Sequence, residues 1–168
     1  MYKVFIDGSA GTTGLKIVER LSGRQDITLI TLPENLRKDY DARKECLNNC
    51  DVAFLCLPDT ASIEAVSMIE NPLVKVIDTS TAHRTKDDWA YGFSELKGFK
   101  EKIEKSNKIA NPGCHASGVI SLIKPLIDNS LINKDICLSC FSLTGYTGGG
   151  KKMIAEYEGD KPFLYNAP

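Results

Sequence analysis

The feature that most constrains this 168-residue chain is a regular alternation between short apolar runs and longer segments with helical periodicity. The apolar runs have the length of strands and occupy residues 3–7, 27–32, 51–58, 74–80 and 108–113. The helical segments between the first four runs are residues 13–22, 40–50 and 59–71. Right-handed strand–helix–strand crossovers place helices on both faces of a parallel sheet. We therefore expect an α/β fold with a Rossmann-like, doubly wound parallel sheet.

The spacing of apolar residues also predicts which face of a helix is buried. In the first helical segment the expected inward stripe is Leu15, Val18 and Leu21. In the third segment Asp59 or Thr60 is the expected N-cap, and the expected inward residues are Ile63, Val66 and Ile69.

The character of the chain changes after the fifth apolar run. A helix is expected from residue 114, followed by a longer strand at 135–143 and a glycine-rich loop. We place a domain boundary near residue 113. Residues 1–113 are then the Rossmann-like domain, and residues 114–168 are the incomplete beginning of a second, α+β domain.

Composition excludes several classes of partner and site. A net charge of −1 gives no reason to expect nucleic acid or a membrane surface as a partner. The apolar runs are too short to span a membrane, and the N-terminus does not resemble a signal peptide, so the cytoplasm is the expected location. In that compartment the six cysteines are expected to be free thiols. Cys137 and Cys140 are three residues apart on a predicted strand, on opposite faces, so no metal site is expected there.

A glycine-rich turn joins the first strand to the first helix. Gly8, Gly11 and Gly14 form a G-x-x-G-x-x-G pattern, and Thr12 and Thr13 add hydroxyl and amide donors. Glycine allows a tight turn and the close approach of a pyrophosphate to a helix N-terminus. The pattern predicts a dinucleotide site; an ordinary strand-to-helix turn, which needs one glycine, is the alternative.

The end of the second strand bears on which dinucleotide is bound. Arg37 and Lys38 lie there together with Glu34. A basic pair suits the 2′-phosphate of NADP, whereas an acid suits the ribose hydroxyl of NAD, so Arg37 favours NADP. The alternative that these are solvated surface charges stays open. Pro58, in the turn after the third strand, lies at the same expected sheet edge and is included among the cofactor-binding residues.

Cys114 differs from the other cysteines in its position. It follows Asn-Pro-Gly and starts a predicted helix, where the helix dipole and unpaired amides favour a thiolate and could stabilise an oxyanion. A buried structural thiol is the alternative. The remaining cysteines that lack such a position are expected to be small core residues: Cys46, Cys56, Cys137 and Cys140.

Five segments of the chain together resemble a known enzyme family. In order they are "KVFIDGSAGTTGL", "CLPD", "DTSTAHR", "ANPGC" and "TGYTGGGKKMI". They are similar to the short form of N-acetyl-γ-glutamyl-phosphate reductase. The resemblance implies NADP-dependent reductive dephosphorylation of N-acetylglutamyl 5-phosphate to the semialdehyde in arginine biosynthesis, through a thioester on Cys114.

The same resemblance implies substrate-binding residues. Arg84 is implied as an anion-binding residue, and Thr144 and Gly145 fall in the family's substrate loop. Read without the family, Arg84 is a surface charge and the loop is a flexible turn or a second phosphate cradle. The unfinished second domain indicates an interface, so a homo-oligomer, dimer or tetramer, is expected for the full-length protein.

The chain departs from the family in one respect. The family carries a catalytic histidine beyond the glycine-rich loop, whereas the two histidines here are His83 and His115. We expect both to be supporting or surface residues, and we expect the chain to stop before the family's histidine. Three accounts remain: a shortened chain, a proteolysed or frameshifted product, or a non-catalytic NADP-binding fragment. Aspartate-semialdehyde dehydrogenase, which shares the glycine pattern, is the alternative enzyme.

Overall fold

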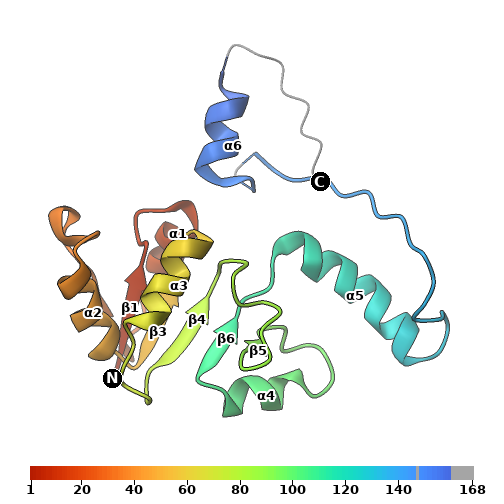
Figure 1. Cartoon of the computed structure of the whole chain (residues 1–168), viewed down its shortest axis with the longest axis horizontal. Helices are drawn as coiled ribbons and strands as arrows, with labels where there is room; N and C mark the ends of the chain where they lie inside the picture. The colour runs from red at the N-terminus through yellow and green to blue at the C-terminus, as the bar shows by residue number, and fades with distance from the viewer. Residues whose placement is uncertain (147, 160–168) are drawn as a thin grey trace. The chain divides into compact units, whose positions relative to one another are not determined.

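The computed structural model describes residues 1–146 and 148–159. The chain divides into two compact units, Met1–Ser117 and Gly118–Pro168, and each is described by itself. The first unit contains a six-stranded sheet in which every pair of neighbouring strands is parallel (Figure 1). This confirms the predicted α/β class.

The strand order is β2-β1-β3-β4-β6-β5. The strands are β1 (Tyr2–Asp7), β2 (Ile27–Ile30), β3 (Val52–Leu55), β4 (Lys75–Asp78), β5 (Ala90–Tyr91) and β6 (Lys108–Ala110). The chain moves outward from β1 to β2 and then returns to place β3 on the other side of β1. This reversal makes the gap between the ends of β1 and β3 a topological switch point, where doubly wound sheets bind ligands.

Helices connect these strands. They are α1 (Thr12–Leu21), the 3₁₀ helix η1 (Glu34–Leu36), α2 (Tyr40–Asn48), α3 (Asp59–Ser67), α4 (Phe99–Lys105), α5 (Cys114–Asp128) and α6 (Gly150–Tyr157). Right-handed crossovers put α1 on one face of the sheet and α2 and α3 on the other, where α2 contacts α3. Consecutive residues Val4, Phe5 and Ile6 of β1 are all buried, because helices cover both faces of this strand.

The buried face of α3 differs from the prediction in part. Ser62, Ala65 and Met68 are buried and Ile63 is 54% exposed, whereas the predicted Val66 and Ile69 are partly buried and pack against the core. Two stripes one residue apart fit the same periodicity, and the structure selects the one with small residues, in which the Ser62 hydroxyl donates to buried Asp78. The expected N-cap was also wrong, because Pro58 holds that position and Asp59 is the first helical residue. Likewise Leu15 in α1 is exposed and Gly14 is buried.

The structure also differs from the prediction in its short elements and in a segment that pairs with no strand. The two-residue strand β5 and the helix α4 were not predicted, because neither has a run long enough to show periodicity. The strand expected at residues 135–143 was wrong: this segment has no regular secondary structure. Its Cys137 and Cys140 are exposed, and not core residues as predicted. A strand needs a partner for its backbone groups, and none of the described residues pairs with this segment.

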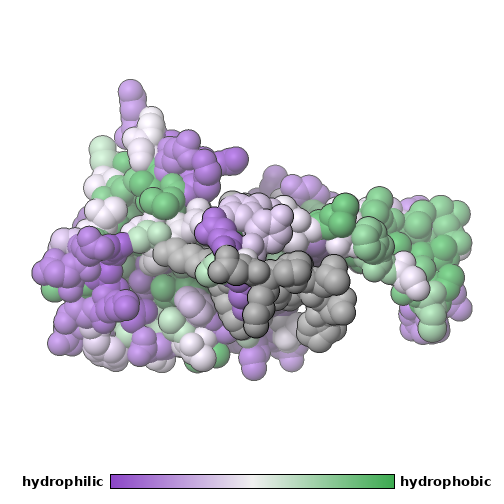
Figure 2. Space-filling model, turned by 90° about the horizontal axis from the view of Figure 1, so that it is seen from above, coloured by the Kyte–Doolittle hydropathy of each residue, from purple (hydrophilic) through white to green (hydrophobic). Residues whose placement is uncertain are grey.

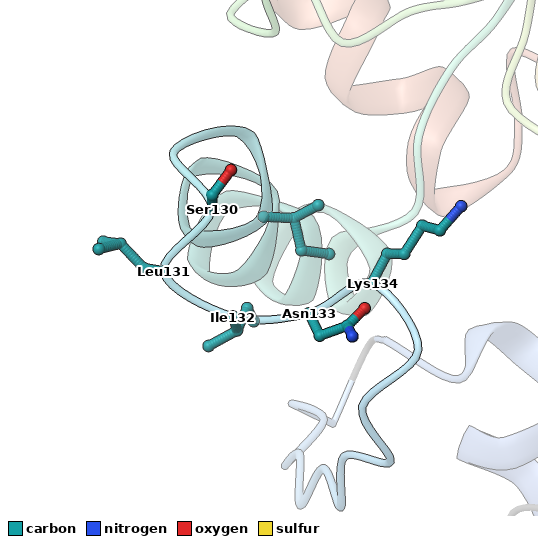
Figure 3. A pocket seen from close by; sticks show the side chains of 6 residues that line it. Ser130, Leu131, Ile132, Asn133 and Lys134 are labelled. Atoms are coloured by element: carbon teal, nitrogen blue, oxygen red, sulfur yellow. The ribbon is translucent and has the colours of Figure 1, made fainter.

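In the second unit, α5 ends in a Schellman motif. Ser130 has a left-handed backbone (φ 56°), its amide donates to the Ile127 carbonyl, and the Leu131 amide donates to the Leu126 carbonyl. The chain after this turn lines an open pocket of about 370 Å³ (Figure 3). Figure 2 shows a large hydrophobic (green) area at its right end. Exposed apolar side chains of α5 and of the turn after it are Val119, Leu122, Leu126 and Leu131.

No helix in residues 1–146 or 148–159 is long and apolar enough to cross a membrane.

Candidate nucleotide and nucleophile site

Four loops of the first unit leave the sheet at the same edge, because parallel strands end together. Backbone hydrogen bonds continue the sheet into these loops. The Cys56 amide donates to the Asp7 carbonyl at 2.8 Å, the Thr79 amide to Leu55 at 3.0 Å, and the Asn111 amide to Asp78 at 2.7 Å. The segments that follow β1, β3, β4 and β6 therefore lie side by side, which brings most of the predicted site residues to one edge.

The glycine-rich turn can only be made by glycine at two positions. Gly8 has φ +83°, and a Cβ there would lie 2.3 Å from the Cys56 carbonyl oxygen. A Cβ on Gly14 would lie 2.3 Å from the Gly8 carbonyl oxygen. Gly11 is less constrained: its amide donates to the Gly8 carbonyl at 2.9 Å, and it is the N-cap of α1. The turn thus packs against the end of β3, across the switch point.

The N-terminus of α1 fits an anion. Its N-cap Gly11 provides no side-chain cap, and the first turn contains no acidic residue. Thr12 and Thr13 are exposed there. First-turn amides have no acceptor inside the helix and carry the positive end of its dipole, so a phosphate group would satisfy them.

A buried ion pair between Arg43 and Asp7, extended to the half-exposed Glu64, lies at the end of β1 next to this turn. The Arg43 Nε and Nη2 atoms each lie 3.1 Å from Asp7 Oδ2, and Nη1 lies 2.9 Å from Glu64 Oε2. Burial raises the pKa of the Asp7 carboxyl, although Arg43 acts to lower it. Burial also acts on Arg43, but its bonds to Glu64 and Asp7 hold its pKa above the usual value. Sequence reasoning missed this network; the signal was an acid directly ending a buried strand.

The residues expected near the adenosine ribose lie beyond β2. Arg37 caps η1 at its C-terminal end, and its Nη2 lies 2.5 Å from Glu34 Oε1. The base that favours NADP and the acid that favours NAD are therefore paired with each other. Glu34 is almost fully exposed, and such surface pairs are weak and readily exchanged. Pro58 is exposed at the start of α3.

Asp78, the last residue of β4, is the centre of a hydrogen-bond cluster. Its carboxylate is fully buried and accepts from Ser62 Oγ (2.6 Å), Ser80 N (3.0 Å), Ser80 Oγ (2.6 Å) and His83 Nδ1 (2.6 Å). Burial raises the pKa of Asp78, but these hydrogen bonds outweigh burial and hold the pKa below its usual value. The His83 ring stacks on Trp89 with centroids 4.1 Å apart. His83 is thus a buried supporting residue.

Arg84 connects the loops after β4 and β6. Its Nε donates to the Asn111 carbonyl at 3.0 Å, and its Nη2 donates to the Thr79 carbonyl at 3.1 Å. Its Nη1 lies against Gly113, where a Cβ would be only 2.8 Å from that nitrogen. The guanidinium is therefore next to the backbone that leads into Cys114.

Cys114 is the first residue of α5 and is exposed. The Gly113 carbonyl accepts from both the amide and the hydroxyl of Ser117, at 2.9 Å each, which fixes the start of the helix. Burial raises the pKa of Cys50 and that of Cys56 to about 11. Of the four cysteines in residues 1–117, only Cys114 is exposed.

Thr144 and Gly145 belong to the second unit and are exposed. The Gly148 amide donates to the Gly145 carbonyl at 2.8 Å, and a Cβ on Gly148 would lie 2.2 Å from Thr144 Oγ1. This is a tight turn in which the Thr144 hydroxyl lies close to Gly148. Its predicted role in binding substrate stays a prediction.

Comparison with known proteins agrees with the resemblance. Residues 33–106 match the family described as "Semialdehyde dehydrogenase, NAD binding domain". An N-acetyl-γ-glutamyl-phosphate reductase from Brucella anthropi is 49% identical over 99% of this chain. The chain spans 57% of the length of that relative.

Solved structures show the same fold. Aspartate semialdehyde dehydrogenase II from Vibrio cholerae has a TM-score of 0.61 at 19% identity, covering 93% of this chain and 50% of that one. Aspartate semialdehyde dehydrogenase from Candida albicans, solved with NADP, has a TM-score of 0.52 at 17% identity, covering 76% and 47%. Residues 33–106 therefore match the NAD-binding domain family of the semialdehyde dehydrogenases, and nearly the whole chain is similar in sequence to N-acetyl-γ-glutamyl-phosphate reductases.

Proposed function

We propose that this chain supplies the NADPH-binding and nucleophile-bearing part of an N-acetyl-γ-glutamyl-phosphate reductase, which reduces N-acetylglutamyl 5-phosphate to the semialdehyde. The observation that carries the proposal is the exposed Cys114 at a helix start, on the sheet edge that also bears the glycine-rich turn. The 49% identity to a named reductase supports the choice of substrate.

The residues support the first chemical step. The Cys114 thiolate attacks the carbonyl carbon of the acyl phosphate, the C–O bond to phosphate breaks, and inorganic phosphate leaves a thioester on the sulfur. Amides of the first turn of α5 are placed to donate to the oxyanion that forms. A bound nicotinamide would supply the hydride for the reduction that follows. His83 is buried, its Nδ1 bonds to Asp78 and its ring stacks on Trp89, so we assign it a supporting role and not that of the base for Cys114.

Thioester formation tests this proposal in the 168-residue chain itself. Mixed with N-acetylglutamyl phosphate, the protein is expected to release one equivalent of inorganic phosphate and to gain an acyl group on the peptide containing Cys114. Cys114→Ser is expected to abolish both signals, while Cys137→Ser, which removes another exposed thiol, leaves them intact. NADPH binding without acylation would instead identify a non-catalytic nucleotide-binding module.

The choice of substrate is tested by competition. Aspartyl phosphate is expected to acylate Cys114 far more slowly than N-acetylglutamyl phosphate. The reverse order would favour aspartate-semialdehyde dehydrogenase activity.

The choice of NADP over NAD rests on Arg37 and is tested by a matched pair of variants. Arg37→Ala is expected to weaken NADPH binding about tenfold or more and to leave NADH binding unchanged, because a charged hydrogen bond to the 2′-phosphate is lost. Glu34→Gln releases Arg37 from its partner and is expected to keep or tighten NADPH binding. Loss of NADH affinity in Glu34→Gln, with Arg37→Ala silent, would indicate NAD.

A further inference from the structure

We propose that His83, held by Asp78, is a positioning residue that sets the Arg84 guanidinium beside Cys114 to receive the anionic group of an acyl phosphate. The proposal rests on the proposed function and assigns a specific task to a buried cluster that the attack step does not otherwise use.

The first argument is the geometry of Arg84. A guanidinium has donors on three nitrogens. Here Nε and Nη2 donate to the carbonyls of Asn111 and Thr79, and Nη1 lies against Gly113. The two backbone bonds fix the plane of the group. The third nitrogen therefore lies against the turn that precedes the nucleophile, and a Cβ at position 113 would displace it from this position.

The second argument is what holds the segment that carries Arg84. Residues 79–84 form the loop after β4, and within this loop His83 and Ser80 bond to the fully buried carboxylate of Asp78. His83 directly precedes Arg84, and its ring is held between Asp78 on one side and the face of Trp89 on the other. Asp78 accepts from Ser62 Oγ, Ser80 N and Ser80 Oγ, and its pKa lies below the usual value. It is therefore a carboxylate, and Nδ1 of His83, which faces it at 2.6 Å, is the proton donor. This bond fixes the backbone from which Arg84 extends.

The third argument is that burial makes the bond between His83 and Asp78 difficult to replace by water. His83 and Asp78 are 7% and 0% exposed. Removing the Nδ1 donor leaves a buried carboxylate with one fewer partner, which drives the loop to rearrange. Asparagine can place an amide donor where Nδ1 lies, whereas glutamine places it nearer to Nε2 and phenylalanine has no donor.

The test measures the charge beside Cys114 through its reactivity. In the full chain at low ionic strength, alkylation of Cys114 is compared for iodoacetate, which is anionic, and iodoacetamide, which is neutral. Peptide mass spectrometry gives the rate ratio at each cysteine, and the exposed Cys137 and Cys140 of the second unit are internal references. A ratio of rates reports a nearby cation and is insensitive to a uniform change in accessibility.

The expected results separate positioning from a merely structural role. The iodoacetate-to-iodoacetamide ratio at Cys114 falls about threefold or more in Arg84→Met, as expected for losing one nearby charge. His83→Phe and His83→Gln lower it by the same factor although Arg84 is still present. His83→Asn keeps the ratio within about twofold of the unmodified protein, since it restores the donor. Inorganic phosphate slows alkylation of Cys114 in the unmodified protein and His83→Asn, and not in the other three.

Several outcomes would overturn the inference. An unchanged ratio in folded His83→Gln, with the ratio reduced in Arg84→Met, means that His83 does not position Arg84. An unchanged ratio in Arg84→Met means that the Arg84 guanidinium does not supply the positive charge near Cys114. If the ratio in folded His83→Asn falls as far as in His83→Gln, the hydrogen bond from Nδ1 does not position Arg84. Because the readout uses no acyl phosphate, thioester formation on Cys114 can succeed or fail independently of each of these results.

Discussion

At the scale of single residues, the site depends on positions where adding a Cβ or removing a hydrogen-bond donor would destabilise the fold. Gly8 and Gly14 leave no space for a Cβ, and Asp78 has four donors around a carboxylate with no access to water. Two of these contacts join residues that are distant in sequence: the added Cβ of Gly8 would meet the Cys56 carbonyl, and Ser62 donates to Asp78.

The glycine turn gives the first prediction. Gly8→Ala is expected to destabilise the first unit by about 1–3 kcal/mol, because alanine is strained at φ +83° and its Cβ would meet the Cys56 carbonyl. Nucleotide binding should weaken as well. Gly23→Ala is the control: no atom lies within 4 Å of its added Cβ, so a change within about 0.5 kcal/mol is expected in urea unfolding. Equal effects of both substitutions would contradict the packing described for the turn.

Asp78 gives a prediction with a defined pH dependence. Its folded pKa lies below the ordinary value of 3.8, so its contribution to stability is present above about pH 4 and is lost as pH falls through the folded pKa. Asp78→Asn is expected to lower the unfolding free energy by about 2–4 kcal/mol at pH 7. The difference from the unmodified protein should narrow in unfolding measured at progressively lower pH below 4. A difference that is constant down to pH 2 would argue against an ionised Asp78.

At the scale of elements, helices are held by small residues and well-formed ends. The side of α3 that packs on the sheet presents Ser62 and Ala65, both fully buried, and α5 ends in a left-handed serine. The residues that stabilise these helices are therefore not the ones that hydrophobicity alone would select.

The face of α3 is tested by two neighbouring substitutions. Ala65→Leu is expected to cost about 1–3 kcal/mol, because the added atoms have no space beneath the helix. Ile63→Ala removes a larger side chain that is 54% exposed, and a change below about 1 kcal/mol is expected in the same denaturant titration. A larger cost for Ile63→Ala would restore the stripe predicted from periodicity.

The end of α5 gives a stabilising substitution. Ser130→Gly keeps the Schellman hydrogen bonds and removes the strain of a Cβ at φ 56°, so a gain of about 0.5–1 kcal/mol in helix stability is expected. Slower amide exchange at Leu131, whose amide donates to Leu126, is the measurement. Asn129→Gly, one residue earlier, is the matched control and is expected to give no gain.

At the scale of the whole molecule, the two units differ in how they are stabilised. The first buries a core against both faces of its sheet, including Phe5, Leu47, Leu55 and Met68. In the second unit many apolar side chains are exposed, for example Leu122 at 72% and Phe141 at 88%. We therefore expect NADPH binding to slow amide exchange and raise stability in the first unit.

Hydrogen exchange measures this difference. NADPH is expected to slow amide exchange in residues 8–14 and 56–59 and to leave residues 118–146 unchanged. At a free concentration 100 times the dissociation constant, it should stabilise the first unit by about 2.7 kcal/mol. Protection that is confined to the second unit would contradict the assigned nucleotide site.

The sequence by itself determined the parallel α/β sheet, the glycine-rich turn and the position of Cys114, because strand-sized apolar runs, glycine spacing and a Pro-Gly turn are local signals. Only the tertiary structure decided the rest. It buried Ser62 instead of Ile63 and bonded Ser62 to Asp78, and it joined Arg43 to Asp7 and Glu64. It also left residues 135–143 without a strand partner among the described residues. Burial and hydrogen bonding between distant residues depend on which elements pack together, and a local pattern does not contain that information.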